Sequence, residues 1–287
     1  MTLDTRIGPQ TARFAVLGES LGHTWSPYIH NSLFAAAGRD AVYLPVTIPR
    51  DRLSSAVDVL RSCFGGFNVT IPYKERIIPL LDGIDDAACA CGAVNTVVCR
   101  DGRLTGHITD GLGLLRALEE GGVQTRGADA LILGSGGAAR AAAVAFLSLG
   151  GRVAFAVRDL PKGERLAHEL ADVQPDGAAR LSVLPLGGEL GAHDVLINCT
   201  PVGMLPHEDA CPVDEATVAR CGAVFDAVYN PRQTRLLAMA RCLGIPCVEG
   251  LGMLYYQAVE AQKLWFGDVG APLDAQRAIY AQLLARM

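Results

Sequence analysis

Residues 128–159, ADALILGSGGAARAAAVAFLSLGGRVAFAVRD, constrain the fold more than any other part of the 287-residue chain. An apolar strand runs into a cluster of glycines, an alanine-rich helix follows, and a second apolar strand closes the segment. Strands that are apolar on both faces are typical of parallel sheets with helices on both sides. The segment therefore predicts a βαβ unit, and the chain an α/β fold.

The turn inside this unit has the spacing of a dinucleotide-binding fingerprint, Gly134-x-Gly136-x-x-Ala139. Gly134 permits the tight turn, Gly136 lets backbone N–H groups approach a pyrophosphate, and Ala139 lets the helix pack against the strand. The helix N-terminus adds N–H donors and partial positive charge. Glycine spacing alone also suits an ordinary tight turn, but the strand–turn–helix context favours a nicotinamide cofactor.

The end of the second strand indicates which cofactor binds. An acidic residue about 20 positions past the glycines would bind a ribose 2′-hydroxyl, whereas an arginine would bind a 2′-phosphate. Arg158, Asp159 and Lys162 all stand in this region. Two cations against one carboxylate favour NADP, and NAD remains the alternative.

The composition excludes several classes of partner. The formal net charge is −5 and no basic cluster is present, which argues against nucleic acid. No apolar run reaches the ~18 residues that a membrane span needs. Residues 1–14 lack the apolar segment of a signal peptide and are expected to form a loose arm. We therefore expect a cytoplasmic protein with no membrane partner.

Cysteine and histidine usage gives no indication of a metal site. The nine cysteines are scattered without a CxxC pair, and the six histidines show no metal-ligand spacing. Buried free thiols in a reducing cytosol are the expected state of the cysteines.

The length predicts two domains, and the remaining pattern indicates their elements. In the first half we expect strands, helices and a hairpin that turns at Asp101-Gly102. The strands are 13–20, 41–48 and 66–71, the helices 26–38, 50–63 and 110–122, and the hairpin 93–108. Strands 193–201 and 222–230 and helix 235–244 follow the βαβ unit. Helices 253–267 and 273–287 have no strand left to pair with and are expected to pack on the first domain.

The stretch GFNVTIPYKE at residues 66–75 reads as a strand, a tight turn and a helix start. Proline cannot continue a central ladder but suits the first turn of a helix. This arrangement would hold Lys74 near the edge of the sheet. On this stretch alone, Lys74 is either an ordinary solvated lysine or a catalytic one.

Seven motifs occur in the order found in shikimate dehydrogenases, and the chain resembles that family over nearly its whole length. They are TWSPYIHN, GFNVTIPYKE, GAVNTV, TDGLGLL, GSGGAAR, FDAVYNP and EGLGMLYYQA. The resemblance implies an N-terminal α/β substrate domain (1–110), a Rossmann-type dinucleotide-binding domain (111–249) and C-terminal helices (250–287) returning to the first. It also implies reversible, NAD(P)-dependent reduction of 3-dehydroshikimate to shikimate.

The resemblance implies a role for particular residues. Lys74 and Asp110 would be the catalytic pair, since a lysine ammonium beside the reacting oxygen can stabilise an alkoxide and supply its proton. The substrate carboxylate would be bound by Thr24 and Ser26, its hydroxyls by Thr70, Asn95 and Gln257, and the cleft lined by Tyr229. The cofactor would be bound by Gly134, Ser135, Gly136, Gly137, Ala138, Arg158, Asp159, Lys162, Thr200 and Gly250, with Met253 near the nicotinamide.

Each of these residues also has an ordinary structural explanation. Thr24, Ser26 and Asp110 could cap helices, and Asn95 could satisfy neighbouring backbone. Tyr229 could belong to a simple turn, and Gln257 could be a surface helix residue. The joint order of the motifs along the chain favours the functional interpretation.

Three positions depart from the family pattern. Thr24 stands in place of a serine, Ile108 in place of the asparagine before Thr-Asp-Gly, and Val157-Arg158-Asp159 in place of Asn-Arg-Thr. Ile108 removes a polar group that could organise the turn around Asp110. A quinate/shikimate dehydrogenase, a slower paralogue acting on a related ring acid, and a non-catalytic ligand-sensing module remain alternatives. A monomer and a homodimer are equally compatible with the sequence.

Overall fold

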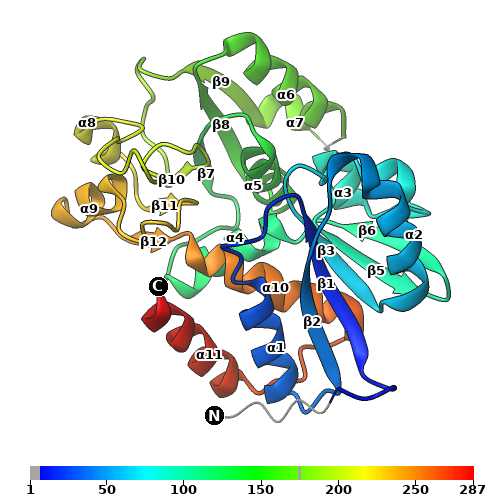
Figure 1. Ribbon diagram of the computed structural model, residues 1–287. Coiled ribbons are helices and arrows are strands. Elements are labelled where there is room, and N and C mark those ends of the chain that lie inside the picture. The colour runs from blue at the N-terminus through cyan, green and yellow to red at the C-terminus, as the bar shows by residue number, and fades with distance from the viewer. Residues whose placement is uncertain (1–6, 174–175) are drawn as a thin grey trace. The chain divides into compact units, whose positions relative to one another are not determined.

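The chain, described by a computed structural model over residues 7–173 and 176–287, forms two compact units (Figure 1). The first unit consists of Met1–Thr109 and Ala258–Met287, and the second of Asp110–Gln257. The predicted α/β class is confirmed, including the return of the C-terminal helices to the first unit. The expected N-terminal arm falls partly on residues 1–6, which lie outside the described residues.

A mixed sheet forms the centre of the first unit, in the order β2-β1-β3-β5-β6-β4. Strand β1 pairs in parallel with β2 and β3, whereas β5 runs antiparallel to β3 and β6. The strands are β1 (Ala12–Gly18), β2 (Ala41–Thr47), β3 (Gly66–Val69), β4 (Gly83–Ile84), β5 (Thr96–Arg100) and β6 (Arg103–His107). The predicted hairpin is confirmed: Asp101 and Gly102 both adopt positive φ between β5 and β6, as this turn requires.

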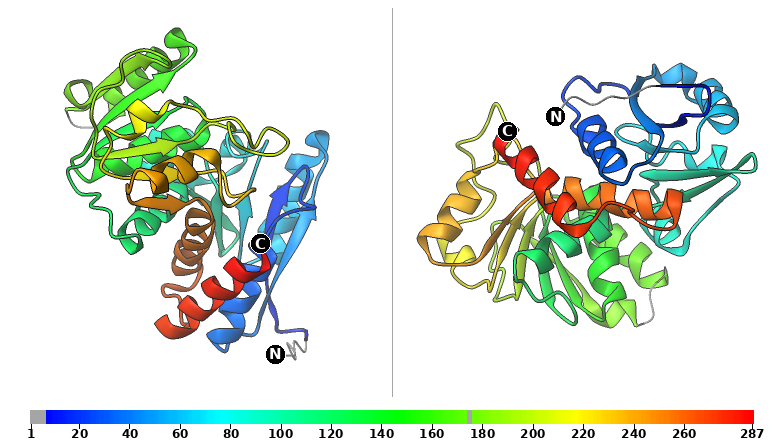
Figure 2. Two further views of the ribbon diagram at one scale, coloured as in Figure 1. Left: turned by 90° about the vertical axis from the view of Figure 1, so that its left-hand side faces the viewer. Right: turned by 90° about the horizontal axis from the view of Figure 1, so that it is seen from below.

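The helices of the first unit come from both ends of the chain. They are α1 (Ser26–Ala36), η1 (Arg50–Arg52), α2 (Leu53–Cys63), η2 (Ile78–Leu80), α3 (Asp86–Cys91), the end of α10 (Leu251–Phe266) and α11 (Leu273–Arg286). Helix α11 lies beside α1 (Figure 2). Trp265 of α10 packs on Phe14 and donates from its indole Nε1 to the carbonyl of Val97 at 3.0 Å. A side chain on Gly66 would collide with this indole, which explains the glycine at the start of β3.

The predicted helix start at Pro72 is wrong. Strand β3 ends at Val69, and residues 71–77 form successive turns before η2. The carbonyl of Lys74 accepts a hydrogen bond from the N–H of Val94 at 2.8 Å. Because that carbonyl bonds to a distant segment, it does not take part in a helical ladder.

The second unit contains a parallel sheet in the order β12-β11-β10-β7-β8-β9. Its strands are β7 (Asp129–Leu133), β8 (Arg152–Val157), β9 (Leu181–Pro185), β10 (Val195–Asn198), β11 (Val224–Asp226) and β12 (Cys247–Glu249). The predicted βαβ unit is confirmed as β7, α5 (Gly137–Ser148) and β8. The strand order reverses between β7 and β10, which is the switch point where doubly wound sheets bind their ligands.

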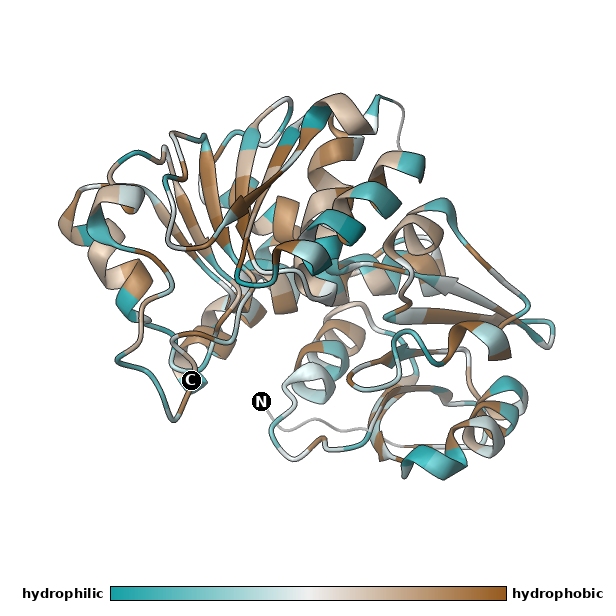
Figure 3. Ribbon diagram, turned by 90° about the horizontal axis from the view of Figure 1, so that it is seen from above, coloured by the Kyte–Doolittle hydropathy of each residue, from teal (hydrophilic) through white to brown (hydrophobic). Residues whose placement is uncertain are grey.

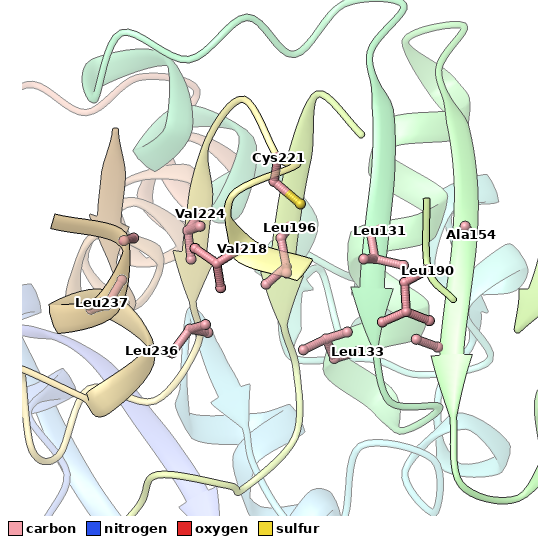
Figure 4. Packing of buried hydrophobic residues seen from close by; sticks show 12 residues of the cluster. Leu131, Leu133, Ala154, Leu190, Leu196, Val218, Cys221, Val224, Leu236 and Leu237 are labelled. Atoms are coloured by element: carbon pink, nitrogen blue, oxygen red, sulfur yellow. The ribbon is translucent and has the colours of Figure 1, made fainter. Parts of the chain in front are cut away.

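Helices cover both faces of this sheet, and its strands are mostly hydrophobic along their length (Figure 3). The helices are α4 (Asp110–Glu120), α5, α6 (Leu160–Val173), α7 (Gly177–Arg180), α8 (Glu215–Val218) and α9 (Arg235–Cys242). On one face, Leu131 and Leu196 pack with Leu236 of α9 (Figure 4). Val157 and Val183 point to the other face of the sheet, where α6 packs. A side chain at Gly163 of α6 would collide with both valines, so a glycine allows this close packing.

The expectation of buried thiols is wrong for most cysteines. All nine lie in the described part of the chain and none forms a disulfide, but only Cys91 and Cys221 are buried. Cys63, for example, lies off the buried stripe of α2, which is formed by Leu53, Val57 and Leu60. Apolar neighbours in sequence therefore did not guarantee burial on an amphipathic helix.

Two further surveys cover the described part of the chain. Within residues 7–173 and 176–287, no helix combines the length and apolar character that a membrane crossing requires. Across the same residues, no group of three or more His, Cys, Asp or Glu side chains could hold a metal ion.

Candidate active site

Three predicted site residues of the first unit meet where β1 and β3 end. Thr70 directly follows β3, and its N–H donates to the carbonyl of Leu17 in β1 at 2.9 Å. The N–H of Val69 donates to the carbonyl of Asn95 at 2.8 Å, and Lys74 is tied to the adjacent Val94. These backbone bonds bring Thr70, Lys74 and Asn95 to one edge of the sheet. Asn95 is buried and Lys74 is half-buried.

The two predicted carboxylate-binding hydroxyls lie together at the start of α1. Thr24 Oγ1 donates to Ser26 Oγ at 3.3 Å and accepts from the N–H of Ser26 at the same distance. Trp25 occupies the N-cap position of α1 and makes no side-chain cap. Neither residue occupies the N-cap position, but Thr24 Oγ1 accepts from the first N–H of α1, so the ordinary structural explanation accounts for Thr24 in part and not for the Ser26 hydroxyl.

Asn95 organises the turn that precedes Asp110. Its Nδ2 donates to Thr109 Oγ1 at 3.0 Å, and its Oδ1 accepts from the Thr109 N–H at 2.8 Å. Ile108 is itself buried, at 7% exposure. An asparagine at position 108 is thus not needed to hydrogen-bond this turn. Asn95, the residue just before β5, makes those hydrogen bonds instead.

Lys74 belongs to the first unit, whereas Asp110 begins α4 and the second unit. Their action as a pair therefore stays a prediction from the sequence.

The glycine turn has the geometry that a dinucleotide requires. Gly134 has a φ of +105°, and a Cβ there would lie 3.1 Å from Thr200 Cγ2, so the ends of β7 and β10 approach closely. Gly136 is the N-cap of α5 and makes no side-chain cap. A Cβ on Gly136 or Gly137 would meet no atom within 4 Å. The α5 N-terminus therefore faces open space, flanked by Ser135 and Ala138 of the same turn, and fits a pyrophosphate.

Asp159 has a structural role that the sequence analysis did not predict. Its Oδ1 accepts from the N–H of Lys162 at 3.0 Å, which makes Asp159 the N-cap of α6. Threonine, the family's usual residue there, is also a good N-cap. Arg158, which directly follows β8, and Lys162, in the first turn of α6, are both exposed and remain available to a 2′-phosphate.

A buried polar network of the second unit begins at Thr200. Thr200 Oγ1 donates to Asn198 Oδ1 at 2.7 Å, and Asn198 Nδ2 donates to Asp226 Oδ1 at 2.9 Å. The other carboxylate oxygen of Asp226 accepts from Thr234 Oγ1 at 2.6 Å. Burial raises the pKa of Asp226, against the smaller effect of these hydrogen bonds. Sequence reasoning missed Asn198 and Asp226, although each is a polar residue ending an apolar strand.

The last predicted site residues lie on the turn from β12 into α10. A side chain on Gly250 would collide with the carbonyls of Asp226 and Ala227, so glycine allows α10 to begin against the end of β11. Gln257 is buried, and its Nε2 donates to the carbonyl of Leu254 at 3.0 Å. It is therefore not a surface residue, which removes its ordinary explanation. Met253 is partly buried one turn earlier.

These features define a two-unit α/β protein with a dinucleotide-type turn and a polar cluster at a sheet edge. Residues 16–97 match the shikimate dehydrogenase substrate binding domain family. A shikimate dehydrogenase (NADP(+)) from Rubrobacter xylanophilus is 42% identical over 276 residues, covering 93% of this chain and 95% of that protein.

Two solved structures are also similar. Shikimate 5-dehydrogenase from Thermus thermophilus, in complex with NADP(H) and shikimate, has a TM-score of 0.82 at 34% identity, covering 93% of this chain and 99% of that one. The ligand-free 5-ketofructose reductase of Gluconobacter has a TM-score of 0.87 at 30% identity, covering 96% and 100%. The chain belongs to the shikimate dehydrogenase family.

Proposed function

We propose that this protein catalyses the reversible reduction of 3-dehydroshikimate to shikimate with NADP as its cofactor. It is an NAD(P)-dependent oxidoreductase, as the family to which it belongs indicates. The observation that most supports the substrate is the meeting of Thr70, Lys74 and Asn95 at one sheet edge. Ammonium, hydroxyl and amide groups are the chemistry that a polyhydroxylated ring ketone requires.

The second unit would hold the cofactor through its backbone and a small number of side chains. The open N-terminus of α5 suits the pyrophosphate, and Thr200 stands beside Gly134 at the neighbouring strand end. Arg158 and Lys162 provide positive charge for a 2′-phosphate, while Asp159 is engaged with its own helix. When bound, the nicotinamide supplies or accepts the hydride. The fit favours NADP over NAD.

Lys74 would act at the reacting oxygen of the ring. Reduction of a ketone leaves developing negative charge on that oxygen, which a lysine ammonium both stabilises and protonates. In the oxidative direction the same amine would take the proton back. Asp110 would orient Lys74 and bond a neighbouring hydroxyl, and the Asn95–Thr109 hydrogen bonds would fix the residue that directly precedes it.

The substrate carboxylate would be bound by Thr24 and Ser26. The ring hydroxyls would hydrogen-bond to Thr70, Asn95 and Gln257. Tyr229 would line the cleft. The extra methyl of Thr24 keeps a hydroxyl at that position. Quinate, a related ring acid, remains the alternative substrate. A neutral ketose is a second alternative, because the 5-ketofructose reductase shares the fold. We expect the protein to act in the cytoplasm, as a monomer or homodimer.

The test of the proposed chemistry is Lys74→Ala, compared with Lys263→Ala as a matched control. Lys263 pairs with Glu260 on the surface of α10 and has no proposed role in the reaction. We expect Lys74→Ala to lower kcat by at least about 100-fold while the Kd for NADP⁺ stays unchanged. Lys263→Ala should behave as the natural protein. Equal loss of cofactor binding and kcat in Lys74→Ala would show that the lysine has been assigned to the wrong place.

A further inference from the structure

A continuous series of hydrogen bonds inside the first unit leads to Asn95, where a ring hydroxyl would bind. It passes through three buried side chains from β2, β3 and β5: Tyr43, Asn68 and Thr96, at 1%, 6% and 0% exposure. None of the three was a predicted site residue.

The first half of the series has a fixed donor direction. Tyr43 Oη donates to Asn68 Oδ1 at 2.6 Å. A phenol has one proton, and Tyr43 gives it to the Asn68 carbonyl oxygen, so the Nδ2 of Asn68 is left to donate to other groups.

The second half fixes Asn95 in the same direction. Asn68 Nδ2 donates to Thr96 Oγ1 at 2.9 Å and to the carbonyl of Asn95 at 3.1 Å. Thr96 Oγ1 donates to Asn95 Oδ1 at 3.0 Å. A single proton arrangement therefore runs from the Tyr43 hydroxyl through Asn68 and Thr96 to the Asn95 amide.

Tyr43 is well placed to hold this arrangement. Its backbone exchanges two hydrogen bonds with the Asn31 side chain, at 2.8 and 2.9 Å, and its ring stacks on His30 at 4.2 Å between centroids. Burial raises the pKa of the Tyr43 phenol well above 10, and burial lowers that of His30 to about 3. Tyr43 therefore stays a protonated donor beside an uncharged imidazole throughout the working pH range.

We propose that Tyr43 is a positioning residue whose hydroxyl, through Asn68 and Thr96, fixes the Asn95 amide for a ring hydroxyl of the substrate. This inference rests on the proposed function. Holding the Asn95 amide in place before the substrate arrives lowers the conformational cost of binding. The effect falls on substrate affinity and not on the cofactor, whose proposed residues belong to the second unit.

The test is Tyr43→Phe, which removes one oxygen and keeps the ring. We expect the KM for shikimate to rise about 3- to 10-fold, with the KM for NADP⁺ unchanged. Tyr28→Phe is the matched control, since Tyr28 lies on α1 beyond Ser26 and its hydroxyl bonds to Gln282 at 3.2 Å. That variant should leave both KM values unchanged.

A double-mutant cycle separates positioning from a general loss of structure. If Tyr43 acts through Asn95, Tyr43→Phe/Asn95→Ala should have nearly the same shikimate KM as Asn95→Ala alone. Additive effects, or equal increases in both KM values for Tyr43→Phe, would overturn the proposal. Should Tyr43→Phe fail to fold, Thr96→Val interrupts the same series before Asn95, and an unchanged shikimate KM would refute it. A natural protein that does not turn over shikimate would instead refute the proposed function.

Discussion

The burial of His30 makes the stability of the first unit depend on pH. The imidazole is fully buried in contact with Phe34, Tyr43 and Trp265. Neither ring nitrogen has a partner within hydrogen-bonding distance. Burial lowers the pKa of His30 from an ordinary 6.5 to about 3, and the opposing effect of the Asn68 side chain is smaller. The folded state therefore keeps His30 neutral at pH values where the unfolded chain protonates it.

The size of the effect follows from proton linkage. Between the unfolded pKa of 6.5 and the folded value of about 3, the unfolded state binds more protons, so stability is lost as the pH falls. From pH 7 to pH 5, this single histidine should lower the free energy of unfolding by about 2 kcal/mol. At pH 5 the imidazole in the folded protein is still neutral. The loss of about 2 kcal/mol therefore comes entirely from protonation of His30 in the unfolded chain.

Tryptophan fluorescence during urea unfolding measures the prediction directly. The chain has two tryptophans, Trp25 and Trp265, and both belong to the first unit, so the signal follows the unit that contains His30. His30→Leu removes the titration while keeping an apolar side chain. Lost packing should destabilise that variant equally at both pH values. Between pH 7 and pH 5, the free energy of unfolding of the natural protein should fall by about 2 kcal/mol more than that of His30→Leu. Equal losses in the two proteins would refute the reasoning.

Two further predictions concern close packing and helix capping. Gly66→Ala places a methyl group against the Trp265 indole and should destabilise the first unit by about 1–3 kcal/mol in the same fluorescence assay, whereas Gly83→Ala, which meets no atom within 4 Å, should have little steric effect. An unchanged free energy of unfolding in Gly66→Ala would show that the Trp265 indole does not restrict the side chain at position 66. Asp159→Ala should cost about 1 kcal/mol and speed hydrogen exchange at the Lys162 amide, while Asp159→Asn should retain the cap. Faster exchange at Lys162 in Asp214→Ala, which uncaps α8 only, would argue against a local effect.

Much of the fold could be predicted because it depends on local pattern. The apolar strands around Gly134 and the Asp101-Gly102 turn specify their conformations within a few residues. Helix α6 and strands β9 and β12 were not predicted, since they are short or largely exposed and have no continuous apolar run. The turn at Pro72 was misread because the partner of the Lys74 carbonyl, Val94, lies 20 residues away.

The candidate site divides in the same way. The residues with a motif, such as Lys74 and the glycines, could be named from the sequence through the family resemblance. The residues that support them could not, because their roles depend on contacts between strands that are distant in sequence. The side chains of Tyr43 in β2 and Asn68 in β3 are hydrogen-bonded to each other, although β1 lies between these strands in the sheet. The N-cap role of Asp159 could not be predicted because helix α6 itself was not predicted. Buried polar residues in apolar strands, such as Asn68 and Asp226, are the one signal that the sequence offered.

The most direct test of the central claim compares initial rates of the purified protein with shikimate or quinate, each with NADP⁺ or NAD⁺. The proposed function predicts the fastest turnover with shikimate and NADP⁺. A preference for quinate or NAD⁺ would make Thr24, Ile108 and Asp159 determinants of specificity. No turnover of shikimate with either cofactor would contradict the account.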